Sequence, residues 1–247
     1  MCADERQWLP PGGQRWTTLA ELAAAGHRSD VRVVEPGLTG IGADPPVAIG
    51  QRSLLVHTPE GNLLWDPSGF IDAAAVTAVR AAGGLSFVTA SHPHFYGAID
   101  AWAREFGADI LVPADDAAWL RAGPDASVRT WSGVLEVLPG VTLVQCGGHF
   151  PGSAVLHWAG GADGRGVLLS GDTIFVTPGE DRVTFLWSAP NRLPLSEAAV
   201  TGVWESVRPY AFDRIYGGWW APVLRSGAWE VVRRSASRYI EHLRGTA

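Results

Sequence analysis

Two histidines, His92 and His94, stand one residue apart directly after an apolar run over residues 85–90, which is typical of a buried strand. Because alternate residues of an extended chain point the same way, a His-x-His pair at a strand end can aim both imidazoles at one point. Imidazole is the commonest metal ligand among side chains. A single pair is equally typical of an ordinary polar loop. The choice between a metal site and a loop therefore depends on other segments.

Two later segments add ligand residues of the same kind. One histidine lies in a glycine-rich turn at residues 147–153, and a carboxylate follows the apolar run of residues 167–169. Each stands in a loop at an expected strand end, as the first pair does. Neutral imidazoles and one carboxylate suit Zn²⁺ or Fe²⁺. The candidate metal ligands are therefore His92, His94, His149 and Asp172.

The order and context of these segments resemble the metallo-β-lactamase superfamily. Its signature is His-x-His-x-Asp-His, then a Gly-His-x-Pro-Gly-Ser-like turn, a Gly-Asp-Thr-like turn and a late histidine. This chain has HPHFYG at 92–97, GGHFPGS at 147–153 and SGDT at 170–173. The resemblance spans roughly residues 31–220. It implies an α/β fold, the four-layer αββα sandwich, and a metal-dependent hydrolase that attacks its substrate with metal-bound hydroxide.

The chain departs from this signature at the family's second metal site. Tyr96 replaces the motif's Asp, Gly97 replaces its final His, and no histidine occurs in residues 216–220, where the late ligand is expected. Of the family's second-site ligands only Asp172 remains, and one carboxylate does not hold a second ion. We expect a mononuclear site with one Zn²⁺ per chain, and Fe²⁺ is the alternative. Asp172 then either binds that ion or orients the water.

The resemblance also suggests roles for residues around the ligands. An Asp at the position of Asp66 hydrogen-bonds a metal-binding histidine in the family, and the alternative is a turn former before Pro67. The hydroxyl of Tyr96 either donates to a developing oxyanion or fills the space of the lost ligand. The expected catalytic residues are Asp172 and Tyr96. The expected wall of the substrate pocket is formed by Phe70, Phe95, Trp219 and Trp220.

Three functions compete on these residues. The first is a mononuclear metallohydrolase acting on a small ester, thioester, lactone or amide. The second is a non-haem iron oxidoreductase similar to the superfamily's sulfur dioxygenases, with His92, His149 and Asp172 as a two-His-one-carboxylate set. The third is a non-catalytic relic of the fold that binds metal or ligand. Zinc in the purified protein favours the first function and iron the second.

Composition narrows the class of partner. The chain has 247 residues, 47% of them hydrophobic and 18% charged, which predicts a globular protein. A net charge of −6 without a basic cluster argues against nucleic acid, so we expect a small-molecule substrate. No apolar run reaches the ~18 residues of a membrane span, and no signal peptide is evident. We expect a cytoplasmic protein that does not enter a membrane. The sequence carries no signal for an oligomeric state.

Periodicity predicts one α/β domain over residues 31–247 after an irregular N-terminal extension, residues 1–30, with a short helix at 18–25. Strands are expected at 31–34, 53–56, 62–65, 85–90, 109–112, 131–137, 141–145, 154–158, 167–170 and 212–215. Helices are expected at 72–82, 98–106, 115–121, 196–207 and 227–244, and loops at 37–46 and 177–195. The remaining histidines are expected to be surface or hydrogen-bonded polar residues: His27, His57, His157 and His242.

Overall fold

A computed structural model describes residues 4–7, 9 and 11–246 of the chain. Its first sheet has seven strands in the order β1-β2-β3-β4-β5-β6-β7. The strands from β1 to β4 are antiparallel neighbours, and those from β4 to β7 are parallel. Their bounds are β1 Arg28–Glu35, β2 Leu38–Asp44, β3 Ser53–Thr58, β4 Gly61–Trp65, β5 Phe87–Thr89, β6 Asp109–Pro113 and β7 Val128–Trp131.

The second sheet has six strands in the order β17-β16-β11-β10-β9-β8. Only its β11–β16 pair is parallel. Their bounds are β8 Val134–Leu138, β9 Val141–Gln145, β10 Ala154–Trp158, β11 Val167–Leu169, β16 Arg214–Tyr216 and β17 Val223–Leu224. Two small ribbons connect β11 to the last helices: β12 Phe175–Val176 with β13 Val183–Thr184, and β14 Leu186–Ser188 with β15 Leu193–Pro194.

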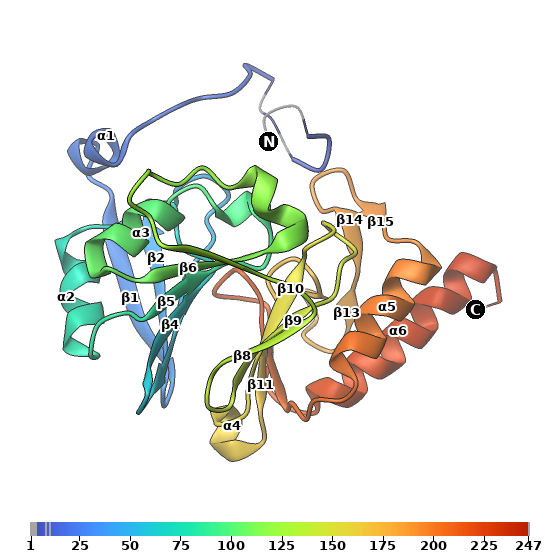
Figure 1. The fold of residues 1–247 in the computed structure, drawn as a ribbon. Coiled ribbons are helices and arrows are strands. Elements are labelled where there is room, and N and C mark those ends of the chain that lie inside the picture. Colours follow the sequence, from blue (N-terminus) through green and yellow to red (C-terminus); the bar gives the residue numbers. More distant parts are fainter. Residues whose placement is uncertain (1–3, 8, 10, 247) are drawn as a thin grey trace.

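The helices cover the outer face of each sheet, so the molecule has four layers (Figure 1). Helices α2 and α3 lie on the first sheet, and α5 and α6 lie on the second. The helical bounds are α1 Leu19–Ala24, α2 Ala73–Ala81, α3 Ile99–Phe106, α4 Gly161–Gly164, α5 Glu197–Val207 and α6 Ala228–Arg244, with 3₁₀ turns η1 Pro93–Phe95 and η2 Ala114–Trp119. The predicted αββα sandwich is confirmed.

The layers follow from alternation along the strands. In β3, Leu54 packs into the core between the two sheets, whereas its neighbour Leu55 packs under the helices, because successive side chains of a strand point to opposite faces. Both faces of the strand are therefore apolar. The second sheet repeats this arrangement, with Leu156 facing the inner core and Val155 facing α5 and α6. Three apolar clusters thus separate the four layers.

The structure corrects three predictions about elements. Residues 37–46, expected to be a loop, contain the whole of β2, and two glycines of this strand lie under the indole of Trp220. Residues 177–195, also expected to be a loop, contain the short strands β13, β14 and β15. Strand β1 starts at Arg28, inside the segment predicted as an N-terminal extension. The helix expected at 18–25 is present as α1, which begins with a capping box at Thr18.

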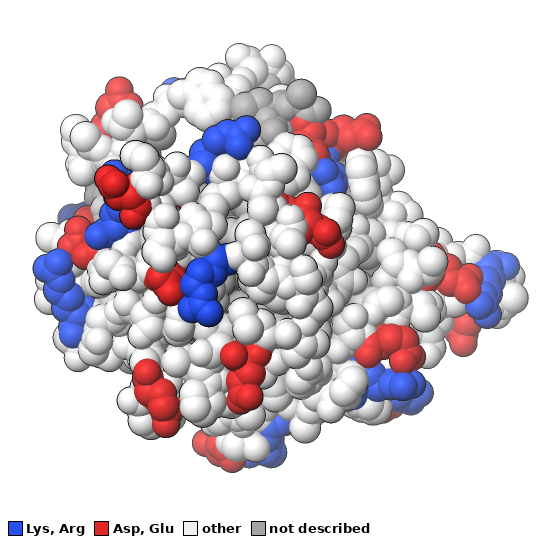
Figure 2. Space-filling model, in the orientation of Figure 1, with Lys and Arg blue, Asp and Glu red and all other residues white. Residues whose placement is uncertain are grey.

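None of the helices in the described part of the chain has the length and apolar character that a membrane span requires. On the face shown in Figure 2, basic and acidic side chains are interspersed and do not gather into a stripe of one sign. Many arginines there and elsewhere are paired with a carboxylate, among them Arg80 with Glu105 and Arg165 with Asp213.

Candidate metal centre

The four candidate ligands meet at one point between the two sheets. His92 and His94 flank Pro93 in the turn η1 after β5, so the first sheet supplies them. His149 lies in the loop between β9 and β10, and Asp172 follows β11, so the second sheet supplies these two. One nitrogen of each histidine and one oxygen of Asp172 all lie within 4.8 Å of one another. This is the one such cluster of metal-ligand side chains within the described ranges.

Two separations inside the cluster match a bound metal ion. The distance from His149 Nε2 to His94 Nδ1 is 3.4 Å, and that from His92 Nε2 to Asp172 Oδ2 is 3.6 Å. Ligands about 2.0–2.1 Å from a tetrahedral zinc lie roughly 3.4 Å from each other. The pairs therefore have nearly the spacing of neighbouring ligands around one ion.

Hydrogen bonds fix which imidazole nitrogen faces the centre. His149 Nδ1 donates to the carbonyl of Trp187 at 2.8 Å, which leaves the Nε2 lone pair free. His92 Nδ1 lies 2.8 Å from Ser91 Oγ, and its Nε2 has no hydrogen-bond partner. The Oδ1 atom of Asp172 is also buried without a partner. Buried polar atoms are rarely left unpaired, so these atoms fit a cation at the centre.

Burial sets the charge of these groups. It lowers the pKa of His94 to about 3 and of His149 to about 4, and it lowers that of His92 well below its usual range. All three imidazoles are therefore neutral at pH 7, the form that binds metals. Burial, with a smaller contribution from Asp66, raises the pKa of Asp172 to about 8. A divalent cation would favour the ionised carboxylate instead.

Asp66 acts on the centre through Ser91. The expected direct hydrogen bond from a metal-binding histidine to Asp66 is not formed; instead Asp66 Oδ1 accepts the backbone N–H of Ser91 at 2.6 Å. The Ser91 hydroxyl lies against His92. Gly171 makes this close packing possible, because a Cβ there would lie 2.0 Å from Ser91 Oγ and 3.0 Å from Asp66 Oδ2. The chain thus places a serine between the carboxylate and the imidazole.

Tyr96 is buried in the apolar cluster under α3 and belongs to no ligand group in the described part of the chain. Its hydroxyl has no hydrogen-bond partner, and burial raises its pKa far above the ordinary value. This environment favours the interpretation of Tyr96 as a space-filling side chain over that of an oxyanion donor. Its catalytic role stays a prediction.

The four aromatic residues expected to line a substrate pocket lie in separate places. Phe95 packs edge-on against His92, with ring centroids 4.5 Å apart. Phe70 is buried in the core. Trp219 stacks on Phe175, and Trp220 lies over the glycines of β2. A common wall made of all four is not found among the described residues, and only Phe95 contacts a metal-ligand side chain directly.

Sequence reasoning missed three residues at the centre. Phe150 is buried edge-on to His94, with ring centroids 4.9 Å apart. The guanidinium carbon of Arg6 lies 3.5 Å from the Phe150 ring centroid, and Arg6 Nη1 donates to the carbonyl of His149. Ser91 and Phe150 are next to ligand residues in the sequence, so a local pattern could have indicated them. Arg6 is 143 residues from His149, so no local pattern could have indicated it.

Residues 4–6 lie against the centre because the ribbon of β14 and β15 holds them. Ser188 Oγ donates to the carbonyl of Arg6, and the side-chain amide of Asn191 donates to the carbonyl of Glu5. Figure 1 shows this segment passing beside β14 and β15. Arg6 also pairs with Asp4, and the side-chain hydrogen bond from Arg6 lowers the pKa of Asp4 to about 2. We call residues 4–6 the N-terminal cover.

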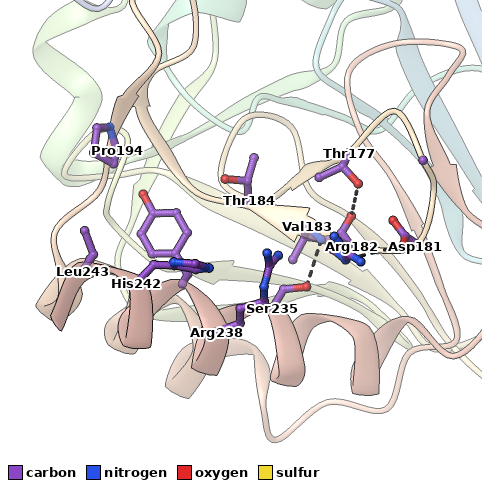
Figure 3. Close-up of a pocket in the computed structure, with 12 residues that line it drawn as sticks. Thr177, Asp181, Arg182, Val183, Thr184, Pro194, Ser235, Arg238, His242 and Leu243 are labelled. Carbon is purple, nitrogen blue, oxygen red and sulfur yellow. Dashed lines mark hydrogen bonds and ion pairs between the residues drawn. The ribbon is translucent and has the colours of Figure 1, made fainter. Parts of the chain in front are cut away.

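A groove of about 610 Å³ lies elsewhere, along α6 (Figure 3). Its lining includes Arg238 and His242 from the helix and Thr177 and Thr184 from the ribbon opposite. His242 is exposed there, and no cluster of metal-ligand side chains is found in the described part of this groove. The groove is therefore a poor site for the chemistry that the sequence predicts.

Comparison with known proteins agrees with this fold. The sequence model of the metallo-β-lactamase superfamily matches residues 48–240. The chain is 38% identical over 245 residues to the uncharacterized protein YmaE of Bacillus subtilis (strain 168), covering 98% of this chain and 89% of that one.

Solved structures of two metallo-β-lactamases are similar at low identity. One is a B3 enzyme with an active-site glutamic acid, with a TM-score of 0.55, 19% identity and coverage of 93% of this chain and 97% of that one. The other is a mutant enzyme from Cronobacter sakazakii, with a TM-score of 0.54, 18% identity and coverage of 87% and 97%. These structures support the fold alone. The family model, which matches most of the chain, and the 38% identical relative establish that the chain belongs to the metallo-β-lactamase superfamily.

Proposed function

We propose that this protein is a mononuclear metallohydrolase that acts on a small ester, thioester, lactone or amide. The observation that carries the proposal is the convergence of three neutral imidazoles and one carboxylate in a buried centre. Membership of the superfamily supports hydrolysis as the class of reaction. It does not imply β-lactamase activity, because one fold carries many chemistries.

A divalent ion at this place would be held by His92, His94 and His149. It would supply an acidified water, whose pKa falls to roughly 7, as the nucleophile at neutral pH. The carboxylate of Asp172 either completes the ligand set or accepts a hydrogen bond from that water and orients it. A closed tetrahedral set of four protein ligands is typical of structural zinc sites, so the hydrolase requires Asp172 to leave one position open.

The surroundings support a single ion and a small substrate. Within the described ranges, the cluster has no further His, Cys, Asp or Glu that would hold a second ion. Phe95 and Phe150 pack against the imidazoles and keep bulk water away from them. The N-terminal cover narrows access from one side. Small substrates reach such a site more easily than polymers do.

The test is the metal content of protein purified without added metal, measured by inductively coupled plasma mass spectrometry. We expect one zinc per chain in the wild type and in His242→Ala, an exposed histidine on α6, and a large loss in His149→Ala. Two metals per chain would contradict the mononuclear site. No metal, even after zinc or iron is added, would contradict the hydrolase and favour a relic of the fold.

Activity assays then separate the chemistries. The zinc protein is screened with small esters, thioesters and lactones, and hydrolysis must disappear in His149→Ala and persist in His242→Ala. If the protein contains iron in place of zinc and consumes oxygen in the presence of a thiol, the proposal of a hydrolase is wrong. The two-His-one-carboxylate oxidoreductase is then the function that fits.

A further inference from the structure

A small cavity of about 140 Å³ lies where the edge strands of the two sheets approach each other. None of the four metal ligands lines it. Its lining comes from β1, from the residue before β3, and from β16, β17 and the residues between and after them: Arg32, Val33, Val34, Arg52, Tyr216, Trp220, Val223 and Arg225.

The cavity contains a buried guanidinium without a counter-ion. Arg52 is 1% exposed, and its Nε and Nη1 atoms have no hydrogen-bond partner. Asp66 attracts this side chain but forms no ion pair with it in the described structure. Burial lowers the pKa of Arg52 to about 10, so it stays charged at neutral pH. A buried charge is costly unless it is paired and hydrogen-bonded.

Strand β2 is shaped to hold the tryptophan of this cavity. A Cβ at Gly40 would lie 2.5 Å from the Trp220 ring, and one at Gly42 would lie 3.2 Å from its indole nitrogen. The guanidinium carbons of Arg32 and Arg52 lie 4.3 Å and 5.3 Å from the ring centroid. The indole thus holds two cations at one place by cation–π attraction.

The positive charge of the cavity is only partly compensated. Arg32 pairs with Asp30 on the same strand, and Arg225 forms no ion pair within the described ranges. Another acid behind the wall, Glu35, accepts from Tyr216 Oη at 2.7 Å and pairs with Arg214 at 2.6 Å. Glu35 is therefore already neutralised, and Arg52 and Arg225 remain without partners.

We propose that this cavity binds a small carboxylate through Arg52 and Arg225. A planar carboxylate accepts two parallel hydrogen bonds from one guanidinium. At Arg52 such a pair uses Nη2 with either Nε or Nη1, so it gives a partner to one of the two unpaired nitrogens and neutralises the charge. The side chains of Val34 and Val223 offer an apolar wall for a short aliphatic tail. The site is separate from the metal centre and does not depend on the proposed hydrolase.

Isothermal titration calorimetry of the full-length protein with isobutyrate tests the site, with isobutyramide as the uncharged probe of the same shape. We expect saturable binding of isobutyrate and none of isobutyramide. Arg52→Gln and Arg225→Gln should each weaken binding by about tenfold or more, because each removes charged hydrogen bonds. Arg238→Gln on α6, in the groove of Figure 3, is the matched control and should bind as the wild type does.

Two further arms identify the ligand and the place. Binding must persist after the metal is removed by a chelator, since carboxylates also bind metal ions; loss on chelation would overturn the assignment to this cavity. A protein that binds phosphate but does not bind isobutyrate would overturn the proposal that the ligand is a carboxylate. Wild-type affinity in Arg225→Gln, which changes an exposed side chain and leaves the fold intact, would overturn the proposal even if Arg52→Gln does not fold.

Discussion

Ser91 connects the buried Asp66 to the imidazole of His92, and its loss should weaken metal binding. In Ser91→Ala the Nδ1 atom of His92 loses its hydrogen-bond partner, and the ring is no longer fixed with Nε2 toward the centre. Loss of such a supporting contact typically costs about 10–100-fold in metal affinity. A zinc competition titration with a chromophoric chelator measures this. Ser237→Ala, an exposed serine on α6, should leave the affinity unchanged.

The buried acids predict how the metal-free protein responds to pH. The pKa values of Asp66 and Asp172 are raised to about 7 and 8, so the folded state holds protons that the unfolded state has released. Stability is then lost as the pH rises through these values, by at most about 1.4 kcal/mol per pH unit for each acid. The histidines have lowered pKa values, and their opposing effect ends near pH 6.5.

Thermal unfolding of chelator-treated protein should therefore show a lower melting temperature at pH 8.5 than at pH 6.5. Protein saturated with zinc should show a smaller drop, because the ion favours the ionised form of Asp172. An equal or higher melting temperature at pH 8.5 without metal would contradict the buried, protonated acids.

At this scale the sequence indicated the ligand residues and the nearby Asp66, but not the contacts that hold the imidazoles in place. The four candidate ligands meet as the motifs implied, because each follows an apolar strand. The hydrogen bond from His149 to the carbonyl of Trp187 uses a backbone atom, which carries no residue signature. Arg6 reaches the centre from the other end of the chain, and only the folded path of the N-terminal cover explains it.

The turn after β11 leaves no room for a side chain at Gly171. Gly171 has a φ of +49°, and a Cβ there would lie 2.0 Å from Ser91 Oγ. Gly171→Ala should displace Ser91 or Asp172, and we expect both a lower melting temperature and weaker zinc binding. Calorimetric unfolding with and without zinc measures both effects.

Gly202, within α5, is the matched control for that substitution. It has open space around the position of a Cβ, and alanine is a better helix former than glycine by about 1 kcal/mol. Gly202→Ala should raise the melting temperature and leave zinc binding unchanged. If Gly202→Ala also lost stability, the effect of Gly171→Ala could not be assigned to the contacts of Gly171 in its turn.

Most elements could be predicted from continuous apolar runs, as in β3 and β10, or from helical periodicity, as in α6. Strand β2 was missed because Gly40 and Gly42 resemble a loop. These glycines are in a strand because the Trp220 ring occupies the space of their side chains. A contact between residues so far apart in sequence cannot be seen in a local pattern.

In the whole molecule the two large sheets face each other, with helices on their outer faces. The candidate metal ligands come from both sheets. A bound ion therefore connects the loop after β5 to the loops after β9 and β11. Ligands that bind only the folded state stabilise it by about 2.7 kcal/mol at a hundredfold excess over the dissociation constant. Metal removal at neutral pH should lower the melting temperature, and added zinc should restore it. A melting temperature that is insensitive to chelation in protein known to contain metal would contradict this connection.

The N-terminal cover has a consequence for the rate at which a metal ion would enter or leave the centre. An ion that enters or leaves the centre on that side must pass Arg6, which is held by Phe150, His149 and Ser188. Exchange with a chelator should therefore be slow in the intact chain and faster in a variant that lacks residues 1–7, with stopped-flow chelation as the measurement. Equal rates in the two proteins would mean that the ion uses another route. For an affinity tag, the C-terminus is the better position, because a tag at the N-terminus is attached next to the residues that lie against the candidate metal centre.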